Sequence, residues 1–167
     1  MDSNTSECSE SSVSLRPVDG ENWREVAKLK VTEAQHEFVA EPCYYLALCN
    51  YGDLWQPLAI YLGKQVIGFM MWAVDTENGS CWLGGILIDQ SMQGQGYGRR
   101  AVQAAVKMLK EEHGYRDFAL SYQPANLEAR HLYSKLGFVE GNEWEDDEVV
   151  ARLSLGGRGG TGEESEE

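Results

Sequence analysis

The 167-residue sequence lacks the features that mark membrane, secreted and metal-binding proteins. No apolar run approaches the roughly 18 residues that a membrane span needs. The first residues are acidic and Ser-rich, unlike a signal or transit peptide. The four cysteines form no CxxC pair, and the histidines do not have zinc-site spacing. We therefore expect a cytoplasmic protein with reduced thiols, no metal and no membrane partner.

Basic residues are also scarce. The chain has 14 Lys and Arg against 27 Asp and Glu, for a formal net charge of -13. Such a chain repels phosphate backbones, which argues against nucleic acid as a partner. A cationic small molecule suits this charge better, although many soluble enzymes are acidic for solubility alone.

The composition is otherwise that of one globular domain. Hydrophobic residues make up 43% of the chain and charged residues 25%, which is enough apolar material for a buried core. Residues 1–12 are rich in Ser and Glu, and residues 156–167 are Gly-rich and then acidic. We expect two disordered tails around a single domain at 13–155.

Hydrophobic periodicity and turn residues predict a mixed α/β (α+β) sheet with helices on both faces. The expected strands are 13–17, 57–62, 65–74, 81–88, 118–122 and 148–153. The expected helices are 21–29, 32–38, 43–50, 99–112 and 126–136. Gly63-Lys64 and Asn78-Gly79 are hairpin signals that join the three central strands.

Residues 86–100 (ILIDQSMQGQGYGRR) form the most informative stretch. An expected buried strand leads through three alternating glycines directly into a helix. Glycines allow a tight turn and close approach to a ligand, and the free N–H groups of a first helical turn bind phosphate. Arg99 and Arg100 oppose the helix dipole unless an anion binds there. The alternative is a Gly-rich turn whose arginines point into water.

Two other phosphate-binding motifs fit poorly. No Gly-x-x-x-x-Gly-Lys-Ser/Thr run exists, which excludes a P-loop. Residues 96–101 match the dinucleotide pattern G-x-G-x-x-G/A, but too few residues follow for a long βαβ series. In addition, no acidic residue ends the strand at 118–122 to hold a ribose.

Two motifs together resemble the GNAT superfamily of N-acetyltransferases. Residues 93–98 (QGQGYG) fit the coenzyme A pyrophosphate motif Q/R-x-x-G-x-G/A, and residues 126–138 (NLEARHLYSKLGF) resemble N-x-x-A-x-x-L-Y-x-x-x-G-F. The resemblance spans about 15–155 and is closest to bacterial diamine and polyamine acetyltransferases. It implies a mixed, mostly antiparallel sheet of six to seven strands, acetyl-CoA as cosubstrate, and a possible homodimer.

The resemblance also implies a set of coenzyme-binding residues. Backbone N–H groups of the glycine-rich turn would hold the diphosphate, Asn126 the pantetheine arm, and an N–H near Leu87 or Ile88 the thioester carbonyl. Gly84-Gly85 would ease a bulge in that strand. The full set is Ile86, Leu87, Ile88, Gln93, Gly94, Gln95, Gly96, Tyr97, Gly98, Arg99, Asn126 and Tyr133.

The catalytic roles follow from the chemistry of amine acetylation. Tyr133, as the resemblance implies, would donate a proton to the departing thiolate; from helical spacing alone it is a core residue. An ammonium with a pKa near ~10.4 must lose a proton before attack. The candidate bases are Glu33, Glu37, Asp75 and Glu148, with His36 as a further candidate base. The candidate amine-binding residues are Glu33, Glu37, Glu41 and Asp75.

Glu33 and Glu37 are four residues apart and would share one helix face, either as a cation site or as a solvated acidic face. The resulting hypothesis is transfer of an acetyl group from acetyl-CoA to a primary amine of a small polyamine or diamine. Acetylation of a protein N-terminus or lysine by the same fold, and a non-catalytic acyl-CoA sensor, remain as alternatives.

Overall fold

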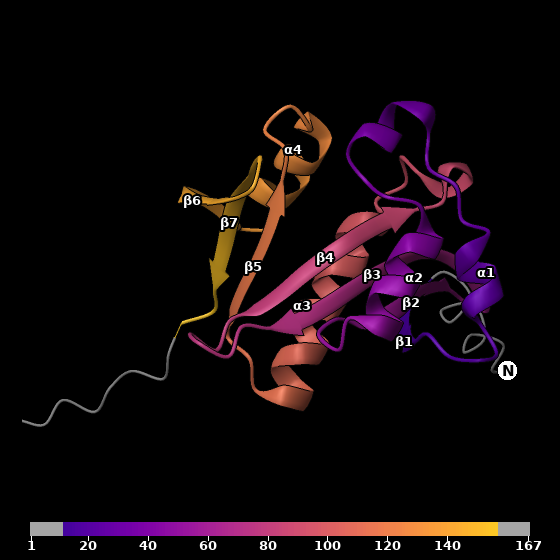
Figure 1. The fold of residues 1–167 in the computed structure, drawn as a ribbon, viewed down its shortest axis with the longest axis horizontal. Helices are drawn as coiled ribbons and strands as arrows, with labels where there is room; N and C mark the ends of the chain where they lie inside the picture. The colour runs from indigo at the N-terminus through magenta and orange to yellow at the C-terminus, as the bar shows by residue number, and fades with distance from the viewer. Residues whose placement is uncertain (1–11, 157–167) are drawn as a thin grey trace, which may run out of the picture.

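A seven-stranded sheet forms the centre of the computed structural model, which describes residues 12–156 (Figure 1). Its strands lie in the order β1-β2-β3-β4-β5-β7-β6, and all neighbours are antiparallel except β4 and β5. The strands are β1 Val13–Pro17, β2 Gln56–Leu62, β3 Gln65–Val74, β4 Cys81–Ile88, β5 Asp117–Tyr122, β6 Val139–Glu145 and β7 Glu148–Ser154. The expectation of a mixed, mostly antiparallel sheet is confirmed.

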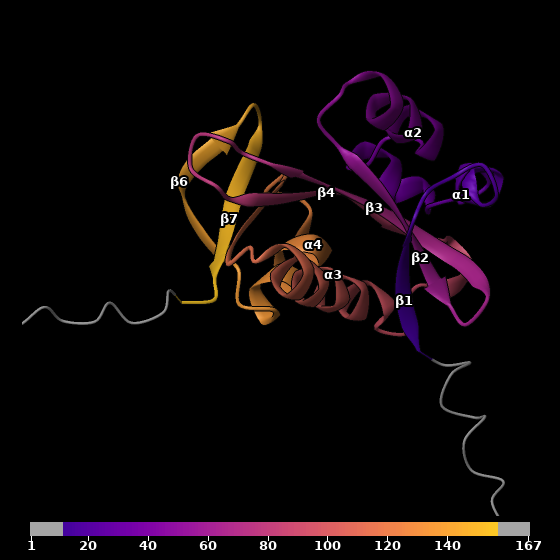
Figure 2. The ribbon, with the colours of Figure 1, turned by 90° about the horizontal axis from the view of Figure 1, so that it is seen from below.

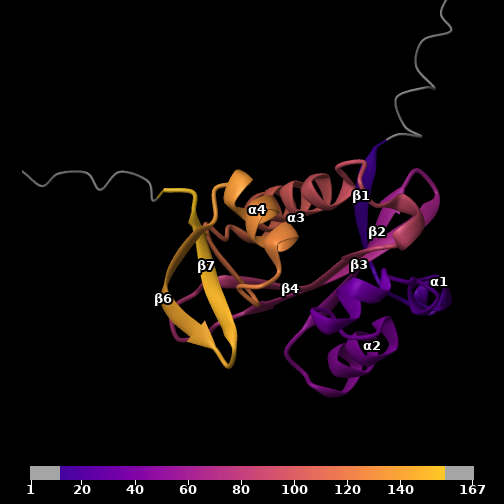
Figure 3. The same cartoon turned by 90° about the horizontal axis from the view of Figure 1, so that it is seen from above.

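Helices cover both faces of the sheet. α1 and α2 lie on one face and α3 and α4 on the other (Figures 2 and 3). The helices are α1 Trp23–Ala27, α2 Pro42–Tyr51, α3 Tyr97–His113 and α4 Leu127–Lys135, with short 3-10 helices η1 Glu33–Glu37 and η2 Gln90–Met92. Within residues 12–156 no helix is long and apolar enough to cross a membrane.

The sheet therefore has a core on each side. On one side α3 buries Ala101, Val102, Ala105 and Leu109, the stripe that a helical period predicts. On the other side a smaller cluster centred on Phe69 packs beneath α1, α2 and the chain that joins them.

Three elements differ from the sequence-based expectation. The helix expected at 21–29 covers just Trp23–Ala27, and the one expected at 32–38 is the 3-10 helix η1. Thr32 and Gln35 form a capping pair at its start, since the Thr32 N–H donates to Gln35 Oε1 at 3.1 Å. Strand β6 was not expected, because its sequence VEGNEWE is acidic and mostly exposed. The predicted tails lie outside the described residues, apart from Ser12 and Gly156.

The feature that positions the site is the separation of β4 from β5. The two strands pair in parallel at Cys81 with Phe118 and at Trp82 with Ala119, and then diverge. In Figure 1 β5 rises toward α4 while β4 runs toward η2. We call the space between them the wedge.

A β-bulge in β4 accompanies the separation. Phe69 pairs with Leu87 but Met71 pairs with Gly84, so the register shifts between them. Gly85 sits in the bulge with φ of 58°, and a Cβ there would lie 3.2 Å from the Phe69 ring. Glycine is needed at this position because the backbone is left-handed and the space is filled.

Candidate active site

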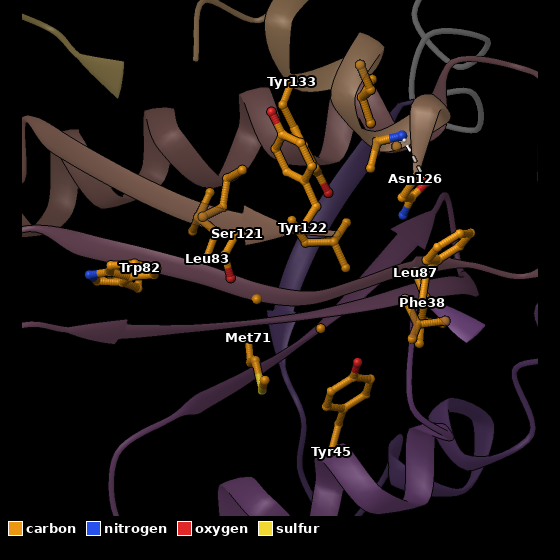
Figure 4. A pocket seen from close by; sticks show the side chains of 18 of the residues that line it. Phe38, Tyr45, Met71, Trp82, Leu83, Leu87, Ser121, Tyr122, Asn126 and Tyr133 are labelled. Carbon is orange, nitrogen blue, oxygen red and sulfur yellow. Dashed lines mark hydrogen bonds between the residues drawn. The ribbon is translucent and has the colours of Figure 1, made fainter. Parts of the chain in front are cut away.

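A cavity of about 940 Å³ occupies the wedge and continues along β4 (Figure 4). One end is lined by the glycine-rich turn, namely Gly94, Gly96, Gly98 and Arg99. The middle is lined by β4, β5 and α4, and the far end by the β3–β4 turn. Of the predicted coenzyme-binding residues, all but Gln95 line it.

The glycine-rich turn presents backbone donors at the start of α3. Gly94 and Gly96 have φ of 77° and 82°, a conformation that L side chains rarely adopt. The Arg100 N–H, which donates to the Gly96 carbonyl at 3.2 Å, makes the first bond into the 17-residue helix. The N–H groups of 97–99 therefore have no intrahelical acceptor and suit an anion. Arg99 lines the cavity beside them.

Asn126 begins α4 at the side of the wedge. Its Oδ1 accepts the Ala129 N–H at 3.3 Å and so caps the helix. Its amide nitrogen has no acceptor among residues 12–156 and is available to a carbonyl in the cavity. The observed helix-capping role of Asn126 is thus compatible with the ligand-binding role expected for it.

Tyr133 enters the wedge from α4. Its ring is buried between Tyr122 and Phe138, at centroid distances of 5.7 and 6.1 Å. Within the described part of the chain no group hydrogen-bonds to its hydroxyl. Burial raises the pKa of Tyr133, and Tyr122, Tyr45 and Glu148 raise it further. The phenol therefore keeps its proton at neutral pH and can donate it.

Tyr45 faces the same space from the opposite side, on α2 (Figure 4). Its ring stacks on Phe69 at 5.8 Å, and its hydroxyl oxygen accepts the Ala40 N–H at 3.0 Å. Burial raises the pKa of Tyr45 although the Ala40 hydrogen bond lowers it, and Glu148 raises it again. Sequence reasoning missed Tyr45, because no motif surrounds it and the fold alone brings it to the wedge.

The predicted carboxylates separate into two groups. Glu148 lines the cavity at the start of β7 and accepts a hydrogen bond of 2.7 Å from Ser121 Oγ. Asp75 lines the far end. By contrast Glu33, Glu37 and Glu41 are exposed and do not line it, and His36 pairs with Glu41 at 3.4 Å.

The expected shared face of Glu33 and Glu37 does not form. η1 is a 3-10 helix, in which residues four apart point about 120° away from each other. A role for these two carboxylates in catalysis or amine binding stays a prediction.

The cavity has an uneven charge distribution. Among the described residues that line it, Arg99 is the one Lys or Arg, and it stands at the glycine-rich end. The five carboxylates that line it are Asp75, Glu77, Glu128, Glu145 and Glu148. The cavity thus offers an anion site at the glycine-rich end, where Glu128 also lies because Gln35 bonds both Gln93 and Glu128. The other four carboxylates stand elsewhere in the lining, and a ligand with an anionic and a cationic part suits this distribution.

Comparisons with known proteins agree with this geometry. The model of the acetyltransferase (GNAT) family matches residues 23–138. A spermine/spermidine N(1)-acetyltransferase of Bacillus subtilis (strain 168) is 26% identical over 133 residues, covering 76% of this chain and 88% of that protein.

Two solved structures share the fold. A spermidine N-acetyltransferase from Vibrio cholerae, in complex with CoA and spermine, matches with a TM-score of 0.67 at 18% identity, over 85% of this chain and 94% of that one. The aminoglycoside acetyltransferase AAC(6')-Ib, in complex with coenzyme A and kanamycin, matches with a TM-score of 0.69 at 20% identity, over 86% and 95%. The chain therefore belongs to the acetyltransferase (GNAT) family and is an acetyl-CoA-dependent N-acetyltransferase.

Proposed function

We propose that the protein acetylates a primary amine of a small polyamine or diamine. The observation that carries this proposal is the charge of the cavity, which has Arg99 at the glycine-rich end and five carboxylates in its lining, with Glu148 beside the wedge. An acidic lining attracts a polycationic acceptor and holds it where the thioester would lie. The Bacillus subtilis relative, named for spermine and spermidine, supports the same substrate class.

The residues present fit acetyl-CoA. The open N–H groups of 97–99 and Arg99 suit a diphosphate, and the Asn126 amide suits the pantetheine arm. Nothing lies within 4 Å of a Cβ placed on Gly94 or Gly96, so the loop leaves room for phosphates. Acetyl-CoA supplies the activated acetyl carbonyl and the thiolate leaving group.

We assign three roles around that carbonyl. A backbone N–H of β4 at Leu87 or Ile88, next to the bulge, donates to the carbonyl oxygen. Glu148 takes a proton from the acceptor ammonium, and the neutral nitrogen attacks the carbonyl carbon. As the carbon–sulfur bond breaks, Tyr133 donates its hydroxyl proton to the thiolate. The second proton, which the attacking nitrogen loses as it becomes the amide, returns the Tyr133 phenolate to the phenol.

The test is release of free thiol from acetyl-CoA with several acceptors. Spermidine and putrescine should give turnover far above the rate without acceptor. Kanamycin and a peptide with a free N-terminus serve as competing acceptors of other classes. Turnover of the peptide alone would replace the polyamine proposal, and tight coenzyme binding without any turnover would favour the sensor. The expectations of a homodimer and of a cytoplasmic location stay predictions.

The glycine-rich turn gives a direct prediction. In Gly96→Ala, an alanine at φ of 82° is strained by about 1–2 kcal/mol, and the turn relaxes by rotating its N–H groups away from the phosphates. We expect the KM for acetyl-CoA to rise by about ten-fold or more.

Gly114→Ala is the matched control, because Gly114 ends the same helix with φ of 76° and equally open surroundings. It should lose similar stability but keep its coenzyme affinity. Equal KM values in the two variants would show that the turn does not hold the phosphates.

A further inference from the structure

A short segment that precedes α2 forms one wall of the cavity. Four of its residues line the cavity, namely Val31, Gln35, Phe38 and Val39, and we call them the wall. Gln35 belongs to η1, and the other three flank it. η1 buries none of its own residues, and it is closed by the Phe38 and Val39 N–H groups, which donate to the Gln35 carbonyl at 2.9 and 3.1 Å. Val31 and Val39 pack against the core on either side of η1. η1 between them has little packing of its own, so side-chain bonds to other elements help to hold it.

A reciprocal pair of amides supplies those bonds. Gln35 Nε2 donates to Gln93 Oε1 at 3.1 Å, and Gln93 Nε2 donates to Gln35 Oε1 at 2.8 Å. Gln93 Nε2 also donates to the Ile88 carbonyl at 2.8 Å, which fixes the amide at the end of β4. Gln35 additionally donates to Glu128 Oε2 at 3.5 Å, on α4. The pair thus joins the wall to the chain that enters the glycine-rich turn.

A second connection holds the beginning of the same segment. The Lys30 N–H donates to Asp89 Oδ1 at 2.9 Å, and the Gln90 N–H donates to the Lys30 carbonyl at 2.6 Å. Residues 89–93 therefore contact the segment at both Lys30 and Gln35, and Gly94 follows directly. A ligand bound at the turn at 94–99 would therefore lie next in sequence to the residues that hold the wall.

We propose that Gln35 and Gln93 are positioning residues that couple coenzyme binding to acceptor binding. Coenzyme phosphates at the turn fix the Gln93 backbone, its amide fixes Gln35, and η1 then holds Phe38 and Val39 against the acceptor. The side chain of Gln93 thereby binds the wall and not the phosphates. The acceptor part of this inference rests on the proposed function. Coupling of this kind is reciprocal, so each ligand raises the affinity for the other.

The experiment compares Gln35→Ala, Gln93→Ala and the double variant with Gln103→Ala, which truncates an exposed glutamine on α3. Hydrogen–deuterium exchange on the full chain measures how well the backbone amides of the wall are protected, and this readout does not depend on turnover. Coenzyme A should slow exchange of the Phe38 and Val39 amides in the wild type and in Gln103→Ala. That protection should be absent in both single variants and in the double variant, and Gln35→Ala, which lies outside the predicted coenzyme-binding set, should change the coenzyme Kd less than about three-fold.

Calorimetry with spermidine measures the coupling itself. In the wild type, saturating coenzyme A should tighten spermidine binding by about five-fold or more. In each single variant the effect should fall below about two-fold, and the double variant should be no worse than either single one. Gln35→Glu keeps the acceptor for the Thr32 N–H and removes the donor to Gln93, so it tests the pair if the alanine variant fails to fold.

The outcomes separate the two proposals. If no amine is acetylated yet coenzyme A still protects the wall through the amide pair, the proposed acceptor is wrong and the coupling stands. If spermidine is acetylated but the wall exchanges equally with and without coenzyme A, the coupling is wrong. The coupling is also wrong if the glutamine variants behave like Gln103→Ala.

Discussion

Replacing Tyr133 by phenylalanine is expected to lower kcat about 100- to 10,000-fold, since general acid catalysis contributes about that much. The coenzyme Kd should stay within about two-fold, because the ring and its packing against Tyr122 and Phe138 remain. The free energy of unfolding should change little, because the Tyr133 hydroxyl has no hydrogen-bond partner within residues 12–156. Steady-state kinetics with a fixed amine, together with calorimetry of coenzyme A, measure both effects.

Tyr61→Phe is the matched control. Tyr61 and Tyr133 are equally buried, at 7% exposure, but the Tyr61 hydroxyl accepts a hydrogen bond from Asn22 Nδ2 at 3.2 Å. Its loss should lower the free energy of unfolding by about 0.5–1.5 kcal/mol and leave kcat unchanged. A Tyr133→Phe enzyme with normal kcat would remove the hydroxyl from the mechanism.

The protonation state of Tyr133 also leads to a prediction for the pH dependence of kcat. Burial raises the pKa of Tyr133 above the ~10 of an exposed tyrosine, so the acid stays protonated over a wider alkaline range. Once the spontaneous hydrolysis of the thioester is subtracted, kcat should show no descending limb up to pH 10. A decline that begins near pH 9 would contradict the assignment.

Replacing Glu148 by glutamine is expected to lower kcat/KM for the amine about 100-fold at neutral pH. At pH 7.4 about one in a thousand molecules of a primary amine with a pKa of ~10.4 is neutral, so proton removal limits the reaction. Glutamine keeps the shape and can still accept from Ser121 Oγ, which isolates the effect of the charge.

The pH profile of kcat/KM distinguishes a base from a residue that only binds the amine. As pH rises toward 10, more amine is neutral in solution, and the deficit of Glu148→Gln should shrink steadily. Glu112→Gln, which removes the same charge from an exposed site on α3, should follow the wild type throughout. A deficit that stays constant with pH would mean that Glu148 binds the amine without taking its proton.

Sequence patterns predicted the central elements well because local chemistry determines them. β3 and β4 were expected at their observed bounds, since hairpin signals lie before and between two apolar runs. β6 was missed because an edge strand has little apolar content of its own and depends on pairing with β7. η1 was expected as an ordinary short helix, because its capping pair does not distinguish a 3-10 from an α-helix.

The residues of the candidate site also fall into two groups, those that a local motif predicts and those that it does not. The glycine-rich turn, Asn126 and Tyr133 belong to contiguous motifs, and the structure places all of them on the cavity. The placement of Tyr45 and of the Gln35–Gln93 pair depends on contacts between segments far apart in the chain. No local pattern reports such contacts, so Tyr45 and Gln35 emerged from the fold alone, and the motif that contains Gln93 did not indicate its pairing with Gln35.

The two residue pairs between β4 and β5 make the shortest ladder in the sheet. The hydrophobic core on the α3 side continues across this line, since it includes both Leu83 of β4 and Phe118 of β5, but the backbone ladder itself is short. A ligand in the wedge contacts both strands and adds interactions across the line that the ladder lacks. Coenzyme should therefore raise Tm, and amides of β4 and β5 should gain the most protection.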